Sequence, residues 1–233
     1  MGLLDRLRRS PGRAQEVLSA AGGPMRTYAE TPLPGVDTPL GELPLLALDF
    51  ETTGFDPKSA HLLSVGYVPV DGRSIVLGGA RHYHVRPPAG SNGVGQSATI
   101  HGLTDDTVAD GVEPREALHD IAAALAGRAL LVHFASVETR FLARICRAAY
   151  GVELPLVVID TMELARRMLP DSPFNDPPRG ALRLWGARAA YGLPVYAAHN
   201  ALLDALSCAE LYLAQTAELA ASGRARQLRH VQS

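Results

Sequence analysis

Short apolar runs along the chain alternate with amphipathic stretches, a pattern typical of strands followed by helices. The dipeptide Asp71-Gly72, between two apolar runs, favours a tight hairpin turn. Because a hairpin meander precedes alternating strands and helices, the pattern predicts an α/β domain with a mixed sheet and helices on its faces. Strands are expected at 45–51, 61–70, 74–77, 80–85, 129–133 and 156–159. Helices are expected at 114–126, 137–150, 161–168, 181–191 and 200–221, with loops at 87–97 and 171–179.

Composition divides the chain into an N-terminal extension (1–42), the predicted α/β domain (43–221) and a short basic tail (222–233). Leucines interleaved with arginines over residues 3–9 predict a short basic amphipathic helix. The Gly22-Gly23-Pro24 run and the prolines that follow it indicate a loose or wrapping segment. The basic helix is expected to pack on its own domain, and docking to a protein partner or a membrane surface is the alternative.

The overall composition excludes several classes of protein. The chain has 233 residues, 47% hydrophobic and 20% charged, which suits one globular domain, and no apolar run approaches the roughly 18 residues of a membrane-spanning helix. The net charge of −2 means that any nucleic-acid binding must depend on a local basic patch or on metal ions. The two cysteines, Cys146 and Cys208, are expected to be buried thiols in a reducing compartment, which favours a cytoplasmic location.

Two carboxylates end the first predicted strand. Because side chains alternate along a strand, Asp49 and Glu51 project from the same face. Two acids beside an apolar strand repel each other unless a cation lies between them, and a hard divalent ion with oxygen ligands would meet that need. The alternative is a strand end that opens into solvent, with both acids hydrated. Gly54 then permits a turn in which the backbone approaches a ligand closely.

A further acid, Asp204, lies inside an otherwise apolar predicted helix, on the same face as Cys208 and Leu211. A buried carboxylate at this place needs a metal ion or an arginine to compensate its charge. His199 precedes the first turn of this helix. It is either a cap or surface histidine, or a general base beside a metal-bound water.

A third region, residues 133–142, joins a predicted strand to a predicted helix. Ser136 is expected to cap the helix, which places Glu138 in its first turn. An acid at this position is either a partner of the helix dipole or a catalytic group, and the local sequence does not distinguish the two.

Four motifs together resemble the DEDDh 3′→5′ exonucleases, in particular the proofreading epsilon subunits of bacterial DNA polymerase III. The resemblance extends from about residue 43 to 221, with the motifs in the family's order, and it implies a ribonuclease-H-like fold: a five-stranded mixed sheet flanked by helices. It also implies two bound Mg²⁺ or Mn²⁺ ions. The motifs are Asp49-Phe50-Glu51-Thr52-Thr53-Gly54, Ile100-His101-Gly102-Leu103-Thr104, residues 133–142, and His199 to Asp204.

The resemblance assigns roles to individual residues. Asp49, Glu51 and Asp204 would ligate the ion on the nucleophile side, with Asp49 shared between both ions. Glu138 would take the place of the family's second aspartate, and His199 would be the general base. Three further residues, Thr52, Thr53 and His101, lie in segments that line the terminal-nucleotide pocket in relatives.

The sequence departs from the family pattern at two positions of the central motif. Phe134 stands where the family has asparagine, and Glu138 where it has aspartate. Glu138 keeps the charge on a side chain one methylene longer, so we expect activity to persist with an altered metal preference. Phe134 could stack on a base or fill the core, and the core is the expectation.

The resemblance predicts a metal-dependent exonuclease that releases nucleoside 5′-monophosphates from single-stranded or frayed 3′ ends of DNA. An exoribonuclease with the same mechanism is one alternative, and a catalytically silent adaptor domain is another. Because only residues 222–233 follow the last predicted helix, we expect a stand-alone repair or turnover nuclease, or attachment to a protein partner through residues 1–42.

Overall fold

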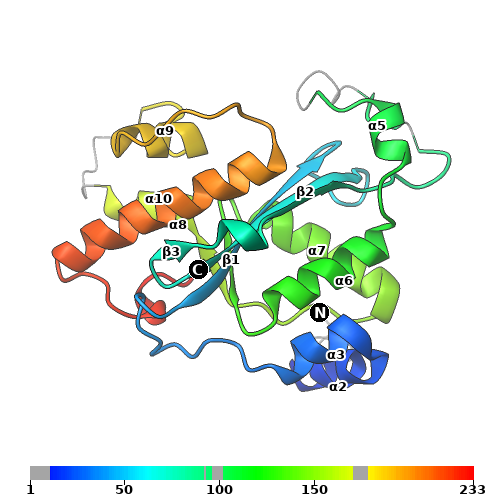
Figure 1. Cartoon of the computed structure of the whole chain (residues 1–233), viewed down its shortest axis with the longest axis horizontal. Coiled ribbons are helices and arrows are strands. Elements are labelled where there is room, and N and C mark those ends of the chain that lie inside the picture. Colours follow the sequence, from blue (N-terminus) through cyan, green and yellow to red (C-terminus); the bar gives the residue numbers. More distant parts are fainter. Residues whose placement is uncertain (1–10, 92, 96–101, 170–177) are drawn as a thin grey trace.

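The computed structural model describes residues 11–91, 93–95, 102–169 and 178–233. Its centre is a six-stranded mixed sheet in the order β3-β2-β1-β5-β6, with β4 paired to β2 (Figure 1). β1 pairs antiparallel with β2 and parallel with β5, which pairs parallel with β6. The expected mixed sheet is confirmed: the resemblance implied five strands, and the sixth is β3, which lies within the strand expected at 74–77 and pairs with β2. The strands are β1 (Pro44–Thr52), β2 (Leu62–Asp71), β3 (Ser74–Ile75), β4 (Arg81–His84), β5 (Ala129–Val132) and β6 (Val158–Asp160).

Helices cover both faces of this sheet (Figure 1). α6 and α7 lie on one face and α10 on the other, beside α8 and α9. The five helices expected in the domain are confirmed, although α9 is shorter than predicted, and α5 was not predicted. The helices are α2 (Pro11–Ala21), α3 (Gly23–Glu30), α5 (Asp105–Ala109), α6 (Pro114–Leu125), α7 (Ser136–Tyr150), α8 (Thr161–Met168), α9 (Leu184–Ala190) and α10 (Ala201–Ala221), with 3-10 turns η1 (Leu77–Gly79) and η3 (Leu228–His230). No helix in the described ranges is long and apolar enough to cross a membrane.

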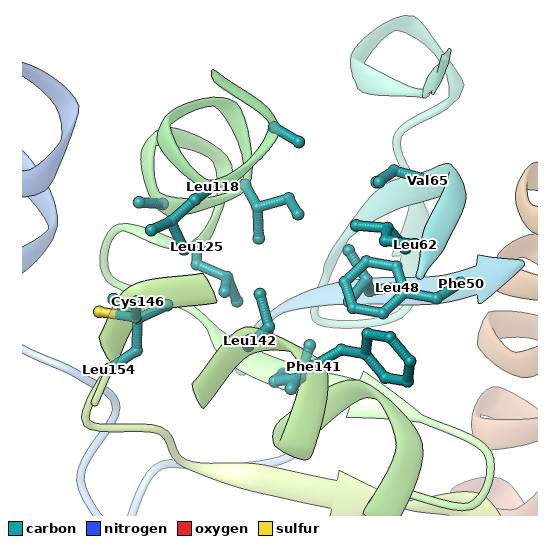
Figure 2. Packing of buried hydrophobic residues seen from close by; sticks show 14 of the residues in the cluster. Leu48, Phe50, Leu62, Val65, Leu118, Leu125, Phe141, Leu142, Cys146 and Leu154 are labelled. Carbon is teal, nitrogen blue, oxygen red and sulfur yellow. The ribbon is translucent and has the colours of Figure 1, made fainter. Parts of the chain in front are cut away.

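Strand β1 separates two hydrophobic clusters, which fixes the direction of its side chains. Leu48 and Phe50 belong to the cluster under α6 and α7, which Figure 2 shows from close by. Leu45 and Ala47 belong to the cluster under α10. Since the period of a strand is two residues, Asp49 continues the row that faces α10.

The segment after Gly22, expected to be loose or wrapping, begins with a helix instead, because α3 covers Gly23–Glu30; residues 31–43 lie outside the helices and strands. Pro24 occupies the first turn of α3, where its missing N–H leaves no hydrogen bond unmade, and Gly22 takes a φ of 76° that the turn from α2 requires. Met25 and Tyr28 are buried in the same cluster as α6 and α7. The helix predicted at residues 3–9 lies outside the described residues.

The short basic tail is packed against the domain through its apolar residues, while Arg224, Arg226 and Arg229 are exposed. The Leu228 N–H donates to the carbonyl of Thr38 at 2.9 Å, and Leu228 itself is fully buried. Val231 is buried in the cluster under α10. Residues 36–40 and the C-terminal segment therefore brace each other beside the sheet.

Candidate active site

Asp49 and Glu51 lie next to the first turn of α10, and a glycine in the neighbouring strand allows the helix to come this close. Asp49 pairs with Gly66 of the neighbouring strand β2. A Cβ atom at Gly66 would lie 2.1 Å from the backbone carbon of Ala201, the first residue of α10. The helix backbone therefore rests directly on the sheet at the level of Asp49, a position that no residue with a side chain would permit.

Asp204 lies in this first turn of α10, and His199 is the residue before the helix cap. Asn200 caps the helix, with its Oδ1 accepting the Leu203 N–H at 3.1 Å. Asp204 is buried, and its Oδ2 accepts the backbone N–H of His199 at 3.1 Å. Glu51, His199 and Asp204 each offer one ligand atom, and these three atoms lie within 4.8 Å of one another. The donor set suits a divalent cation.

Glu138 approaches from the opposite side of the sheet. It lies in the first turn of α7, is 3% exposed, and its Oε2 has no hydrogen-bond partner among the described residues. Ser136 does not cap this helix, because the chain before it is held from elsewhere. The carboxylate of Asp160 accepts the N–H groups of Phe134 and Ala135 at 3.0 and 2.8 Å.

Burial of the acids, reinforced at Asp49 by the charges of its acidic neighbours, is the main electrostatic feature of the site. Burial raises the pKa of Asp49 well above its ordinary value, and the charges of Glu138, Glu51 and Asp204 raise it further. Burial, with the nearby charge of Asp160, raises the pKa of Glu138 to about 8. Acids gathered in this way favour a bound cation, which would stabilise their ionised forms. The fully buried arginine of the described chain, Arg188, pairs with Glu210 at 2.8 Å instead of serving this cluster.

The candidate substrate-binding residues have different surroundings. The Thr52 hydroxyl donates to the carbonyl of Gly54 at 2.8 Å, and the Thr53 hydroxyl accepts the His61 N–H at 2.8 Å. Both hydroxyls therefore help to close the turn beside Glu51. His101, the third predicted pocket residue, lies outside the described residues.

Two strained residues border the acids. In the described part of the chain, Phe134 and His199 are the non-glycine residues with positive φ, at 78° and 64°. Such strain is concentrated at functional sites in proteins. Phe134 is also 44% exposed, so the expectation that it fills the core is wrong.

Asp160 is the polar residue that the sequence analysis missed. It is 8% exposed and also caps α8 by accepting the Met162 and Glu163 N–H groups. A signal was present, since an aspartate before a helix-forming stretch is typical of a cap. Nothing local indicated that the same carboxylate would reach across to Phe134 and Ala135, because that contact spans 26 residues.

The sheet order and the helices on both faces agree with the ribonuclease-H-like fold that the resemblance implied. A family model described as Exonuclease (RNase_T) matches residues 46–212, and the chain belongs to this exonuclease family. Its members generally use divalent metal ions, which agrees with the ligand atoms found together here.

Named relatives include DNA polymerase III proteins. The chain is 28% identical to the DNA polymerase III subunit epsilon of Haemophilus influenzae over 179 residues, 73% of this chain and 66% of that protein. It is 27% identical to the PolC-type DNA polymerase III of Thermotoga maritima over 177 residues, 76% of this chain but only 12% of that protein. The nuclease domain of 3′hExo, a DEDDh family member bound to rAMP, has the same fold, with a TM-score of 0.61, 16% identity, and coverage of 77% of this chain and 92% of that domain.

Proposed function

We propose that this protein is a metal-dependent 3′→5′ exonuclease that removes nucleoside 5′-monophosphates from the 3′ ends of DNA. The observation that carries the proposal is the gathering of acids at the end of β1: the ligand atoms of Glu51, His199 and Asp204 lie within 4.8 Å of one another, and the charges of Glu51, Glu138 and Asp204 all act on Asp49. These acids come from both sides of the sheet, and their clustering is electrostatically unfavourable without a cation.

Each acid then has a task in holding ions. Asp49, Glu51 and Asp204 would hold one divalent ion, Mg²⁺ or Mn²⁺, and Asp49 with Glu138 would hold a second. Divalent ions held by these residues would supply two effects: a lower pKa of the attacking water and compensation of the negative charge on the phosphoryl oxygens. The longer side chain of Glu138, compared with the family's aspartate, reaches further and supports the expected change in metal preference.

His199 is suited to accept the proton of the attacking water. It is exposed at the edge of the acid cluster, and its backbone N–H is held by Asp204, so its position is tied to a metal-ligating side chain. As the water oxygen bonds to phosphorus, its proton would pass to the imidazole; the oxygen of the broken P–O bond would take a proton from solvent and leave as the 3′-hydroxyl of the shortened strand. Thr52, Thr53 and His101 are proposed to contact the terminal nucleotide.

DNA is the proposed substrate because the named relatives are DNA polymerase III proteins. RNA is the second candidate, favoured by the rAMP bound to the 3′hExo domain of the same fold. A silent adaptor is disfavoured, since a domain without catalysis has no physical reason to keep four acids together in a largely buried cluster.

The deciding experiment measures release of labelled nucleotides from matched DNA and RNA oligomers in Mn²⁺, with and without chelator. Asp49→Ala should abolish release, whereas Glu16→Ala, which removes an exposed acid on α2 outside the cluster, should leave it unchanged. Absence of release from both oligomers by the unaltered protein would favour the adaptor. Faster release from RNA would favour the exoribonuclease.

A further inference from the structure

The outer surface of α7 carries two adjoining cavities. One, of about 480 Å³, lies between α7, the start of α6 and the start of β2. The other, of about 600 Å³, lies between α7 and the turn after β1. Arg144 lines both, so the cavities form one continuous surface, which we call the α7 surface.

This surface is basic although the whole chain has a net charge of −2. Arg140, Arg144 and Arg147 are spaced by four and three residues, which places them on one side of the helix. Six cationic side chains line the two cavities among the described residues, against two carboxylates. The cationic residues are Lys58, Arg86, Arg115, Arg140, Arg144 and Arg147.

Existing contacts leave much of this positive charge available. Both lining carboxylates, Glu113 and Glu153, already pair with arginines, and Arg140 pairs with an acid outside the lining, so three of the six cationic side chains have a carboxylate partner. Arg115 is exposed and stacks its guanidinium over the Tyr150 ring, 5.3 Å from the ring centre. Arg144 donates to the carbonyls of the turn after β1, which holds it without neutralising it. A polyanion is therefore the ligand that this surface fits.

The floor of the first cavity is apolar. Leu62, Phe141 and Ile145 line it, and Leu62 and Phe141 belong to the packed cluster shown in Figure 2. An apolar floor with a cationic rim matches a chain that carries flat bases on a phosphate backbone, as a single nucleic-acid strand does.

The α7 surface continues from the acid cluster. Phe141 lies three residues after Glu138 on α7, so the two share one side of the helix. His61, also in the cavity wall, is hydrogen-bonded to Thr53, two residues after Glu51. From Glu138 to Arg147 the helix rises about 13 Å, longer than the spacing of successive phosphates along a strand.

We propose that the α7 surface binds the phosphate backbone of the substrate strand on the 5′ side of the terminal nucleotide. The inference rests on the proposed function, because it places the scissile phosphate at the acid cluster. It adds the direction in which the strand leaves that cluster and the arginines that hold it.

The test is the triple variant Arg115→Gln/Arg140→Gln/Arg147→Gln in the full chain. With dT12 in Mn²⁺, we expect KM to rise about tenfold at unchanged kcat, while cleavage of the dinucleotide dT2, too short to reach the surface, stays as before. The slope of log KM against log salt should fall by about 2, since three phosphate contacts on a single strand are removed. Anisotropy of labelled dT12 in Ca²⁺ measures binding independently of turnover and should show the same rise in Kd.

A matched control removes three exposed arginines from other faces, Arg26→Gln/Arg166→Gln/Arg224→Gln, with the same change in net charge. An equal loss of dT12 binding in this control would overturn the proposal, because the loss would then come from the net charge of the whole protein and not from the α7 surface. An unchanged Kd in the test variant would overturn it as well. A failed exonuclease is recognised separately, by absence of nucleotide release from dT2 and dT12 in the unaltered protein, and the anisotropy experiment still tests the α7 surface.

Discussion

Backbone strain at Phe134 is the clearest sign at the residue scale that function constrains this sequence. A phenylalanine in the left-handed region is unfavourable by about 1 kcal/mol, and nothing in the packing demands an aromatic ring that is 44% exposed. The family's asparagine adopts this conformation more readily. The ring is therefore best explained by contact with a ligand, and stacking on the terminal nucleoside is our interpretation.

Phe134→Asn should make the protein more stable and the enzyme weaker. We expect the free energy of unfolding in urea to rise by about 1 kcal/mol as strain is relieved. KM should rise about tenfold as stacking is lost. The control is Phe55→Asn, which changes an exposed phenylalanine without positive φ and should give no stabilisation. A more stable Phe134→Asn with unchanged KM would restrict this residue to a structural role.

Glu138 makes the stability of the metal-free protein depend on pH. Its pKa is raised from 4.5 to about 8 in the folded state, so the native state holds a proton that the unfolded chain releases. The contribution of Glu138 to the free energy of unfolding should therefore be highest below pH 4.5 to 5, and it should fall as the pH rises toward 8.

Glu138→Gln tests this relation because it keeps the shape and removes the charge. In chelator at pH 8.5, urea unfolding should show the variant more stable than the unaltered protein by about 2 kcal/mol, with the difference small at pH 5. Nucleotide release should nevertheless fall by at least about 100-fold, since one metal ligand is lost. Equal stability of the two proteins at pH 8.5 would contradict the raised pKa.

At the scale of elements, the site depends on how closely α10 approaches the sheet. Gly66→Ala would place a Cβ 2.1 Å from the α10 backbone and push the first turn, with Asp204, away from Asp49. We expect a loss of about 2 kcal/mol in stability from overpacking and a fall in kcat of about 100-fold from the displaced ligand. Gly78→Ala, where the added Cβ meets nothing within 4 Å, is the control. Normal turnover in Gly66→Ala would show that α10 can shift without moving Asp204.

Periodicity in the sequence was sufficient for most elements but not for their contacts. A continuous apolar run predicted β1, which is buried on both faces, and apolar residues at helical spacing predicted the helix at 200–221. Composition misled at Gly22 to Pro24, where residues that usually break helices instead start one. The roles of Gly66 and Asp160 could not be predicted, since both depend on which segment lies opposite them in the folded chain.

At the scale of the whole molecule, opposite charges are sorted onto neighbouring surfaces. The acids gather at the end of β1, while arginines gather along α7, and the small net charge of −2 conceals this separation. Sequence analysis predicted that nucleic-acid binding would need either metal ions or a local basic patch. The structure supplies a site suited to the first and a surface suited to the second, side by side.

Divalent ions should therefore act on the stability of the entire fold. The acid cluster joins β1, α7 and α10, so an ion bound there binds the native state and not the unfolded chain. At a concentration about 100 times its Kd, Mn²⁺ should stabilise the protein by about 2.7 kcal/mol and raise Tm by about 5 °C or more, and chelator should reverse the shift. Asp204→Asn should remove most of the Mn²⁺-dependent shift, whereas Glu153→Gln, an acid outside the cluster, should keep it. A Tm in the unaltered protein that does not respond to Mn²⁺ would mean that these acids do not hold an ion, and the mechanism proposed from them would fail.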